Sequence, residues 1–242
     1  MDGGARGGAA ARMFGLLGRM GRGWWIVAFA VTAGTNLIDF FVIAAGGAAT
    51  PAFTAAVAVR VVLVFWLGYA LTRRLAGVER PAAPTAALGR YALFMIGVTV
   101  LMGAMTGLAT LIVGNRGVAT TGAVSALLGA LAGLLLVRLF AWQAALAVGD
   151  RTLGPTGAWR RLAGQNGALV LAYLAILPVV AAHHALTHYA LQLFDRPDLL
   201  AAVAIVDGLV SALQLALSAA LAVVAWTIAA GSRPLREAPA LA

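Results

Sequence analysis

The chain has 242 residues, of which 62% are hydrophobic and only 10% are charged, and its mean hydropathy is +0.96. Soluble domains average about 45–50% apolar and about 25% charged residues, so this composition predicts an integral membrane protein. All 17 basic residues are Arg, which excludes a lysine Schiff base. The sequence has no Cys, which excludes disulfides, thiolate nucleophiles and cysteine-ligated metal centres.

The N-terminal segment is rich in Gly, Ala and Arg, and we expect residues 1–22 to form a disordered or interfacial basic tail. Its apolar side chains Met13, Phe14, Leu16 and Leu17 predict a short turn that lies in the membrane interface.

Six apolar segments that are long enough to cross a bilayer follow this tail. About 20 apolar residues cross the hydrocarbon core, where an unpaired backbone amide costs several kcal/mol, so each segment is predicted to be helical. The predicted fold class is therefore all-α, with a six-helix membrane domain over residues 23–230 and a cytoplasmic tail over residues 231–242. The first span is too long for a signal-peptide core, so we expect it to be retained. The spans lie near residues 24–46, 52–72, 91–113, 118–140, 166–190 and 202–228.

Arginine placement predicts that both termini are cytoplasmic, because short loops rich in Arg stay on that side of a membrane. Thirteen arginines fall in the two tails and in the loops after the second and fourth spans, whereas the opposite loops hold only Arg116 and Arg196. The Ala, Gly and Arg bias is typical of a GC-rich bacterial genome, so the expected location is the bacterial inner membrane. The net charge of +9 is assigned to topology and lipid contact, and no nucleic acid partner is expected.

Two loop regions are long enough to describe. Residues 73–90 predict a linker. Residues 141–165 predict a cytoplasmic segment in which Trp142 and Trp159 stand where interfacial aromatic residues belong, and residues 158–162 are expected to lie along the headgroups. We expect Arg138, near the cytoplasmic end of the fourth span, to reach the headgroups as an anchor.

One stretch has a layout that occurs in a known family: Val137-Arg138-Leu139-Phe140, then Ala144-Ala145-Leu146-Ala147 and Asp150, and then Gly157-Ala158-Trp159-Arg160-Arg161 before another apolar span. In this layout residues 137–190 resemble bacterial six-span proteins of the type found as the membrane domain of some glycerophosphodiester phosphodiesterases. Where that family more usually has a Thr-Arg-Gly-like element, this chain has Gly164-Gln165-Asn166-Gly167. The resemblance implies a non-catalytic membrane domain, because the family's phosphodiesterase chemistry belongs to a separate soluble domain.

Charged side chains inside a membrane are costly, so their positions carry the most functional information. Polar residues recur at helical spacing on two spans, as Thr32, Thr35, Asn36 and Asp39 on the first and as Asp207, Ser211, Gln214 and Ser218 on the sixth. Counting along the spans predicts one polar cluster in the non-cytoplasmic third of the membrane, made of Asp39, Arg60, His183, His184 and Asp207.

This cluster has two main interpretations. In the first, Arg60 pairs with Asp39 or Asp207, and the ion pair fixes the helix registry without any ligand. In the second, the cluster lines a water-accessible cavity, open to the outside, that binds a small solute, an ion or a lipid headgroup. A third possibility is a misplaced span boundary, with Arg60 extending to the interface.

The histidines of the fifth span raise the question of a metal. His184 and His188 are four residues apart and form a weak candidate pair, whose third ligand would be Asp207 or Asp39. The zincin pattern is missing, and a b-type haem needs histidines on facing helices. We therefore predict no metal and no cofactor.

Pro178 and two glycine pairs carry predictions about helix bending and helix packing. Pro178 frees the carbonyl of Leu174 and predicts a kink in the fifth span. The pairs Gly103-x-x-x-Gly107 and Gly129-x-x-x-Gly133 predict close helix contacts, either within one chain or between subunits.

The sequence shows no nucleophile with its base, no phosphate-binding loop and no carboxylate pair set for catalysis, so we predict no catalytic residues and no enzyme. The leading hypothesis is a non-catalytic inner-membrane subunit or scaffold in envelope or lipid homeostasis, or in a larger membrane complex. Its expected partners are membrane lipids and other membrane subunits or further copies of the chain. The alternative is a transporter or permease component that binds a small solute or ion in an outward-facing polar cavity.

Overall fold

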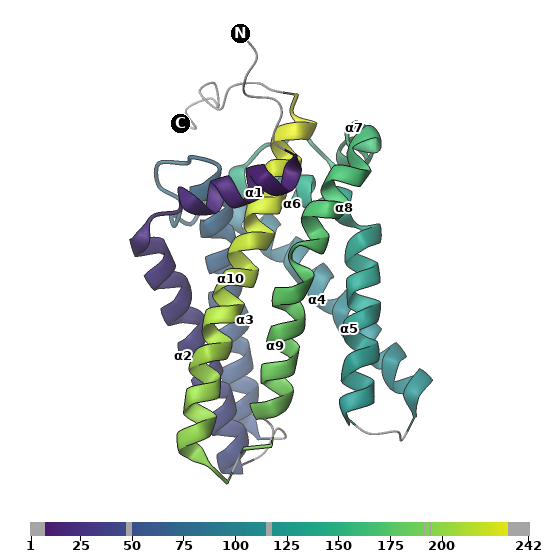
Figure 1. The fold of residues 1–242 in the computed structure, drawn as a ribbon. Coiled ribbons are helices and arrows are strands. Elements are labelled where there is room, and N and C mark those ends of the chain that lie inside the picture. The colour runs from purple at the N-terminus through teal and green to yellow at the C-terminus, as the bar shows by residue number, and fades with distance from the viewer. Residues whose placement is uncertain (1–7, 47–49, 115–117, 191, 194, 232–242) are drawn as a thin grey trace.

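A computed structural model describes residues 8–46, 50–114, 118–190, 192–193 and 195–231. These residues form helices and connecting turns, so the predicted all-α fold class is confirmed for this part of the chain. The long helices are α2 (Arg22–Gly46), α3 (Pro51–Leu75), α4 (Ala86–Val113), α5 (Val118–Leu135), α9 (Leu177–Ala190) and α10 (Pro197–Ala229) (Figure 1). The short helices are α1 (Ala9–Gly18), α6 (Phe140–Val148), α7 (Pro155–Arg161) and α8 (Asn166–Leu174), with single 3-10 turns η1 (Val137–Leu139) and η2 (Ala163–Gln165).

Among the described residues, five helices are long and apolar enough to cross a membrane, or six if one bent pair is a single span. The five candidate spans are Arg22–Ala45, Pro51–Leu75, Ala86–Val113, Ala163–Ala190 and Pro197–Ala229, of which Ala163–Ala190 consists of η2, α8 and α9. The predicted fourth span, residues 118–140, is not one straight helix. It is bent by 62° between Thr120–Leu135 and Val137–Val148.

Helix α6 explains this bend. Its side chains Ala141, Ala144 and Ala145 are fully buried, and α6 packs against α10 in the core. The first part of the predicted segment 141–165 therefore forms a helix that packs in the core of the bundle. The run of alanines offers no polar face for the headgroups, but its small side chains allow close contact between helices.

Helix α10 lies at the centre of the bundle, where it contacts α2, α3, α6 and α9 (Figure 1). Helices α4 and α5 pack on each other beside this bundle. Only 11% of the apolar window of α4 is buried, against 39% for α2. The chain's own core is therefore built mainly by helices other than α4.

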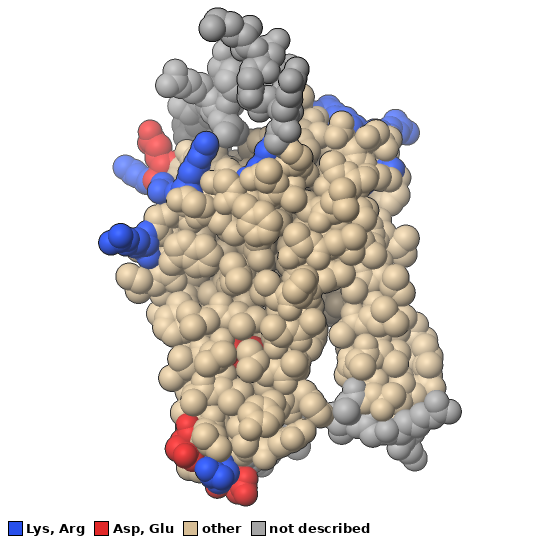
Figure 2. Space-filling model, viewed as in Figure 1, with Lys and Arg blue, Asp and Glu red and all other residues tan. Residues whose placement is uncertain are grey.

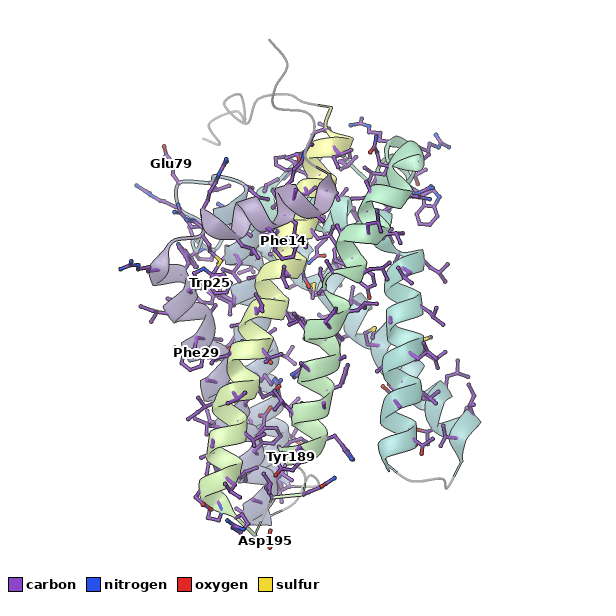
Figure 3. All side chains as sticks on the ribbon, viewed as in Figure 1. Phe14, Trp25, Phe29, Glu79, Tyr189 and Asp195 are labelled. Atoms are coloured by element: carbon purple, nitrogen blue, oxygen red, sulfur yellow. The ribbon has the colours of Figure 1, made fainter. Side chains whose placement is uncertain are left out.

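Charged side chains gather at the two ends of the molecule, and an almost wholly uncharged belt separates them (Figure 2). One end, called the α1 end here, holds α1, the α3–α4 loop with Glu79, α7 and the C-terminal end of α10; the opposite end holds Asp195 (Figures 1 and 3). This distribution is typical of a protein that spans a membrane.

Helix α1 lies across the α1 end of the bundle (Figure 1). It buries Ala9, Met13 and Leu17 against the core, while Phe14 is 51% exposed (Figure 3). The stretch expected to contain a short interfacial turn thus contains a ten-residue helix. Residues 1–7 and nearly all of the expected tail at 231–242 lie outside the described residues.

The loop between α3 and α4 is shorter than the predicted linker 73–90, because α3 continues to Leu75 and α4 begins at Ala86. Arg73, which is only 6% exposed, holds it by donating hydrogen bonds to the carbonyls of Ala147 and Arg80. The guanidinium also lies 5.1 Å from the centre of the Tyr69 ring, so carbonyl dipoles and an aromatic face stabilise its charge.

The predicted glycine pairs behave differently from each other. On α5, a Cβ on Gly129 would meet Met102 of α4, and one on Gly133 would meet the Tyr173 hydroxyl of α8. On α4, Gly103 and Gly107 have nothing within 4 Å of an added Cβ. Among the described residues, the α5 pair therefore serves contacts within the chain, and the α4 pair does not.

A glycine also lets the backbones of α2 and α10 approach each other closely. A Cβ on Gly208 would lie 2.5 Å from the Cα of Ala33, so the two backbones meet where Gly208 has no side chain. The Thr32 hydroxyl donates a 2.7 Å hydrogen bond to the Gly208 carbonyl across this contact. Gly208 therefore sets the distance between α2 and α10.

We predict that Gly208→Ala destabilises the protein by about 1–3 kcal/mol, since the added methyl group forces the two backbones apart. Thermal unfolding in nanodiscs measures this as a lower melting temperature. The matched control is Gly97→Ala on α4, where an added Cβ meets nothing within 4 Å. Equal melting temperatures for the two variants would show that the close approach does not limit stability.

Candidate functional site

Asp207 on α10 is the centre of a buried polar network that joins three helices. The residue is 1% exposed. Its Oδ2 accepts a 2.9 Å hydrogen bond from the Asn36 amide on α2, and its Oδ1 lies 2.7 Å from His183 Nδ1 on α9. Ser211 Oγ, one turn along α10, lies 3.2 Å from the same imidazole nitrogen. Both carboxylate oxygens of Asp207 thus have partners.

A second polar contact joins α2 to α3. Arg60 NH1 lies 2.6 Å from Asp39 Oδ2, so of the two partners considered for Arg60 the structure selects Asp39. The Arg60 side chain is 33% exposed and that of Asp39 only 8%. The other oxygen, Asp39 Oδ1, is buried and has no hydrogen-bond partner within the described part of the chain.

These two contacts lie close together in the bundle, because Asn36 and Asp39 are separated by less than one turn of α2. One helical turn rises about 5.4 Å, so Asp207 and Arg60 approach α2 at nearly the same level. The four residues come from α2, α3 and α10. Antiparallel packing therefore gathers residues that are far apart in the sequence.

The remaining predicted site residues are placed as follows. The His184 ring packs 5.6 Å from that of His183, centre to centre, and His184 is exposed on α9. His188 lies 3.3 Å from Gln192, near the end of α9. Gln214 is half-buried on α10, beyond Ser211 from Asp207.

The metal hypothesis for His184 and His188 gains no support. Among the described residues, no three of the side chains of His, Asp and Glu form a group that could hold a metal ion. Asp207 is already occupied by Asn36 and His183, which is the physical reason that it does not join the other two histidines.

A second cluster at the α1 end was not predicted as a unit. Arg138 donates to the Asn166 side chain and to the Trp159 carbonyl, and its guanidinium lies 4.8 Å from the centre of the Trp159 ring. The prediction that Arg138 is a headgroup anchor therefore omits its main contacts, which tie η1 to α7 and α8. An Arg followed by an interfacial Trp about twenty residues later is the signal that could have suggested this pairing.

Asp150 lies next to this cluster and joins α6 to α10. Its Oδ2 accepts a 2.9 Å hydrogen bond from Trp226 Nε1, and its Oδ1 accepts from the backbone and side chain of Thr152. Burial alone would raise the pKa of Asp150. The hydrogen bonds from Trp226 and Thr152, with the nearby charge of Arg161, outweigh burial and lower that pKa from its ordinary value of 3.8.

Chemically, the Asp207 network can hold and exchange protons, since it contains a carboxylate and an imidazole in direct contact. The Asp39–Arg60 pair can fix the position of two helices. Ser211 adds a hydroxyl within hydrogen-bonding distance of His183.

No protein-family model, curated protein or solved structure matches this chain.

We predict that Asp207→Ala lowers the free energy of unfolding by about 1–3 kcal/mol, because the Asn36 amide and His183 lose their acceptor in a buried site. Denaturation in mixed micelles monitored by tryptophan fluorescence provides the measurement. Asp198→Ala is the matched control, since Asp198 lies on the same helix with a side chain that is 71% exposed. Asp198→Ala should change the free energy of unfolding by no more than about 0.5–1 kcal/mol. A smaller loss for Asp207→Ala than for Asp198→Ala would contradict a stabilising role.

The Asp150 contacts predict a pH-dependent contribution to stability. Its lowered pKa means that the folded protein favours the carboxylate, so the contribution is full well above 3.8, the ordinary value. It is lost as the pH falls through the pKa of the folded state. The melting temperature of wild type minus that of Asp150→Asn should therefore shrink as the pH falls from 7 to 3. The exposed carboxylate of Glu79 gives the control Glu79→Gln (Figure 3). A gap that stays constant with pH would contradict the assignment.

Proposed function

We propose that this chain is a non-catalytic inner-membrane subunit or scaffold that acts in envelope or lipid homeostasis or within a larger membrane complex. The observation that carries the proposal is that polar groups inside the bundle are paired with one another. Asp207 accepts from Asn36 and contacts His183, and Asp39 holds Arg60. Such internal pairing fixes helix register and leaves few groups for a substrate.

The proposed topology has six spans with both termini in the cytoplasm, the bent pair of α5 and α6 counting as one span. Its support is the charge distribution, because arginines dominate the α1 end (Figure 2). The described arginines on helices and loops of this end are Arg12, Arg19, Arg22, Arg73, Arg74, Arg80, Arg90, Arg138, Arg151, Arg160 and Arg161. Residue Arg196 lies at the opposite end, beside Asp198.

The resemblance of residues 137–190 to the membrane domain of some glycerophosphodiester phosphodiesterases is part of this proposal. That domain is non-catalytic, which agrees with a scaffold role. The residues that carry the resemblance include Arg138, Asp150 and Trp159, and here their side chains connect short helices to one another. We therefore assign this stretch a structural role at the cytoplasmic face.

Helix α4 is the proposed contact surface for another membrane subunit or a further copy of the chain. Leu93 is 71% exposed and Leu111 is 83% exposed on this helix. Gly103 and Gly107, which lie between them, have nothing within 4 Å of an added Cβ. Small residues on an uncovered helix face allow another helix to approach closely.

The second candidate function is a transporter or permease component that binds a small solute or ion. One observation favours it: Asp39 Oδ1 is buried without a partner, beside an Arg60 side chain that is 33% exposed. A solute with a donor group would satisfy that oxygen. This candidate predicts stoichiometric binding that is lost in Asp39→Asn.

The scaffold proposal predicts a specific neighbour on α4. A photo-crosslinking amino acid at Leu111 should give one stoichiometric adduct in native membranes, with another subunit or a second copy of the chain. The same amino acid at Ile26 on α2, where the native side chain is 66% exposed, is the control and should give no discrete adduct. Purified protein that is monomeric in native nanodiscs and binds a small solute one to one would instead favour the transporter component.

A further inference from the structure

The charge state of the Asp207 network depends on one proton. With an ionised carboxylate, Asp207 needs a donor at Oδ1, so His183 must present its Nδ1–H there, 2.7 Å away. His183 Nε2 is then free to accept a further proton. With Nε2 unprotonated, the pair carries one net negative charge, and with Nε2 protonated it is a neutral imidazolium–carboxylate pair.

Among the described residues no Arg pairs with Asp207, and the ionisable neighbour of the pair on α9 is His184. On α2 the facing groups are Asn36, which is neutral, and Asp39, whose charge is balanced by Arg60 of α3. On α10 the nearest polar group is the neutral Ser211. Helices α5 and α8 also pack against α9. Helix α5 has no titratable side chain in Val118–Leu135, and the titratable side chain of α8 is Tyr173, which lies at Gly133.

A buried net charge is expensive in a medium of low dielectric constant, and uptake of one proton removes it. We propose that Asp207 and His183 form a binding site for one exchangeable proton, taken up at His183 Nε2. The transferred species is H⁺ from water, and no other bond is made or broken. This site is independent of the scaffold function and adds an activity to it.

The structure also limits the route by which the proton arrives. On the side of the α1 end, buried Ile176, Ala212 and Leu217 close the interior around α10. On the other side, a separate buried cluster of Phe40, Ala190, Leu193, Leu200 and Ala204 closes the contact of α2, α9 and α10. A direct path along the bundle axis is therefore blocked by apolar side chains at both ends.

The surface of α9 remains as the route. The His183 side chain is 21% exposed, although Asp207 beside it is only 1% exposed. His184 is exposed and its ring centre lies 5.6 Å from that of His183. His184, whose ring packs on that of His183, is assigned the role of relaying a proton from water to His183.

The test uses the full chain, labelled with ¹⁵N and ¹³C at histidine, in nanodiscs. Because the sequence has three histidines, the variants His184→Gln and His188→Gln assign every signal. In wild type, nuclear magnetic resonance between pH 4 and 9 should show that Nδ1 of His183 stays protonated while Nε2 takes up one proton per chain. In Asp207→Asn, proton binding at His183 should weaken by tenfold or more.

Two results would overturn the binding site. One is a His183 that takes up no proton at Nε2 anywhere in this range in wild type. The other is an identical titration of His183 in wild type and Asp207→Asn. Should Asp207→Asn fail to fold, the wild-type titration still decides, and in a sample labelled with ¹³C at aspartate as well, a carboxyl cross-peak from Asp207 to the His183 Nδ1–H replaces the variant.

The route is tested separately, by the rate of proton exchange at His183. His184→Gln should slow this exchange tenfold or more while leaving the titration midpoint within experimental error. His188→Gln, one turn further along α9, is the matched control and should change neither quantity. An exchange rate that is the same in wild type and His184→Gln would remove His184 from the route, with the site itself intact.

Discussion

The contact between α2 and α10 combines a close backbone approach with hydrogen bonds that only one register permits. Gly208 lets the two backbones meet, Thr32 donates to the Gly208 carbonyl, and Asn36 donates to Asp207 one turn away along α2. A hydrogen bond between transmembrane helices contributes only about 0.6 kcal/mol on average, so none of these bonds alone holds the bundle. Their shared register matters more, because sliding one helix past the other would leave several buried polar groups without partners.

The position of α10 determines the roles of the other helices. Since α10 contacts α2, α3, α6 and α9, its buried Asp207 meets partners on two of these helices. The α6 segment reaches this core because its alanines are small, and the 62° bend at the end of α5 is the consequence. Helix α4 remains at the edge and keeps most of its surface.

The all-helical fold and the approximate span positions could be predicted from composition and hydropathy alone, because the cost of burying polar backbone in lipid allows few alternatives. The break near Pro178 was also predictable: α8 ends at Leu174, whose carbonyl the proline leaves without its helical donor. The packing of residues 140–148 in the core of the bundle was not predictable. A run of Ala, Leu and Val after an arginine has the same composition at an interface as in a core, and only the tertiary fit decides between them.

The pairing of side chains inside the candidate site could not be predicted from the sequence either. Spacing placed Asp39, Arg60 and Asp207 at similar depths, but depth does not determine the direction in which each side chain points around its helix. The choice of Asp39 for Arg60 and of His183 for Asp207 depends on which helices are neighbours in the bundle. Contacts such as Arg73 with backbone carbonyls leave no sequence signal, because a carbonyl acceptor exists at every residue.

The length of α4 has a consequence for the bilayer around the protein. Its 28 residues extend about 42 Å, whereas a hydrocarbon core is about 30 Å thick. A helix with this hydrophobic mismatch relieves it by tilting, and α4 is free to do so because its apolar window is only 11% buried. In a membrane of different thickness the tilt of α4 and its neighbour α5 would therefore adjust, while the hydrogen-bonded helices α2, α9 and α10 keep their arrangement.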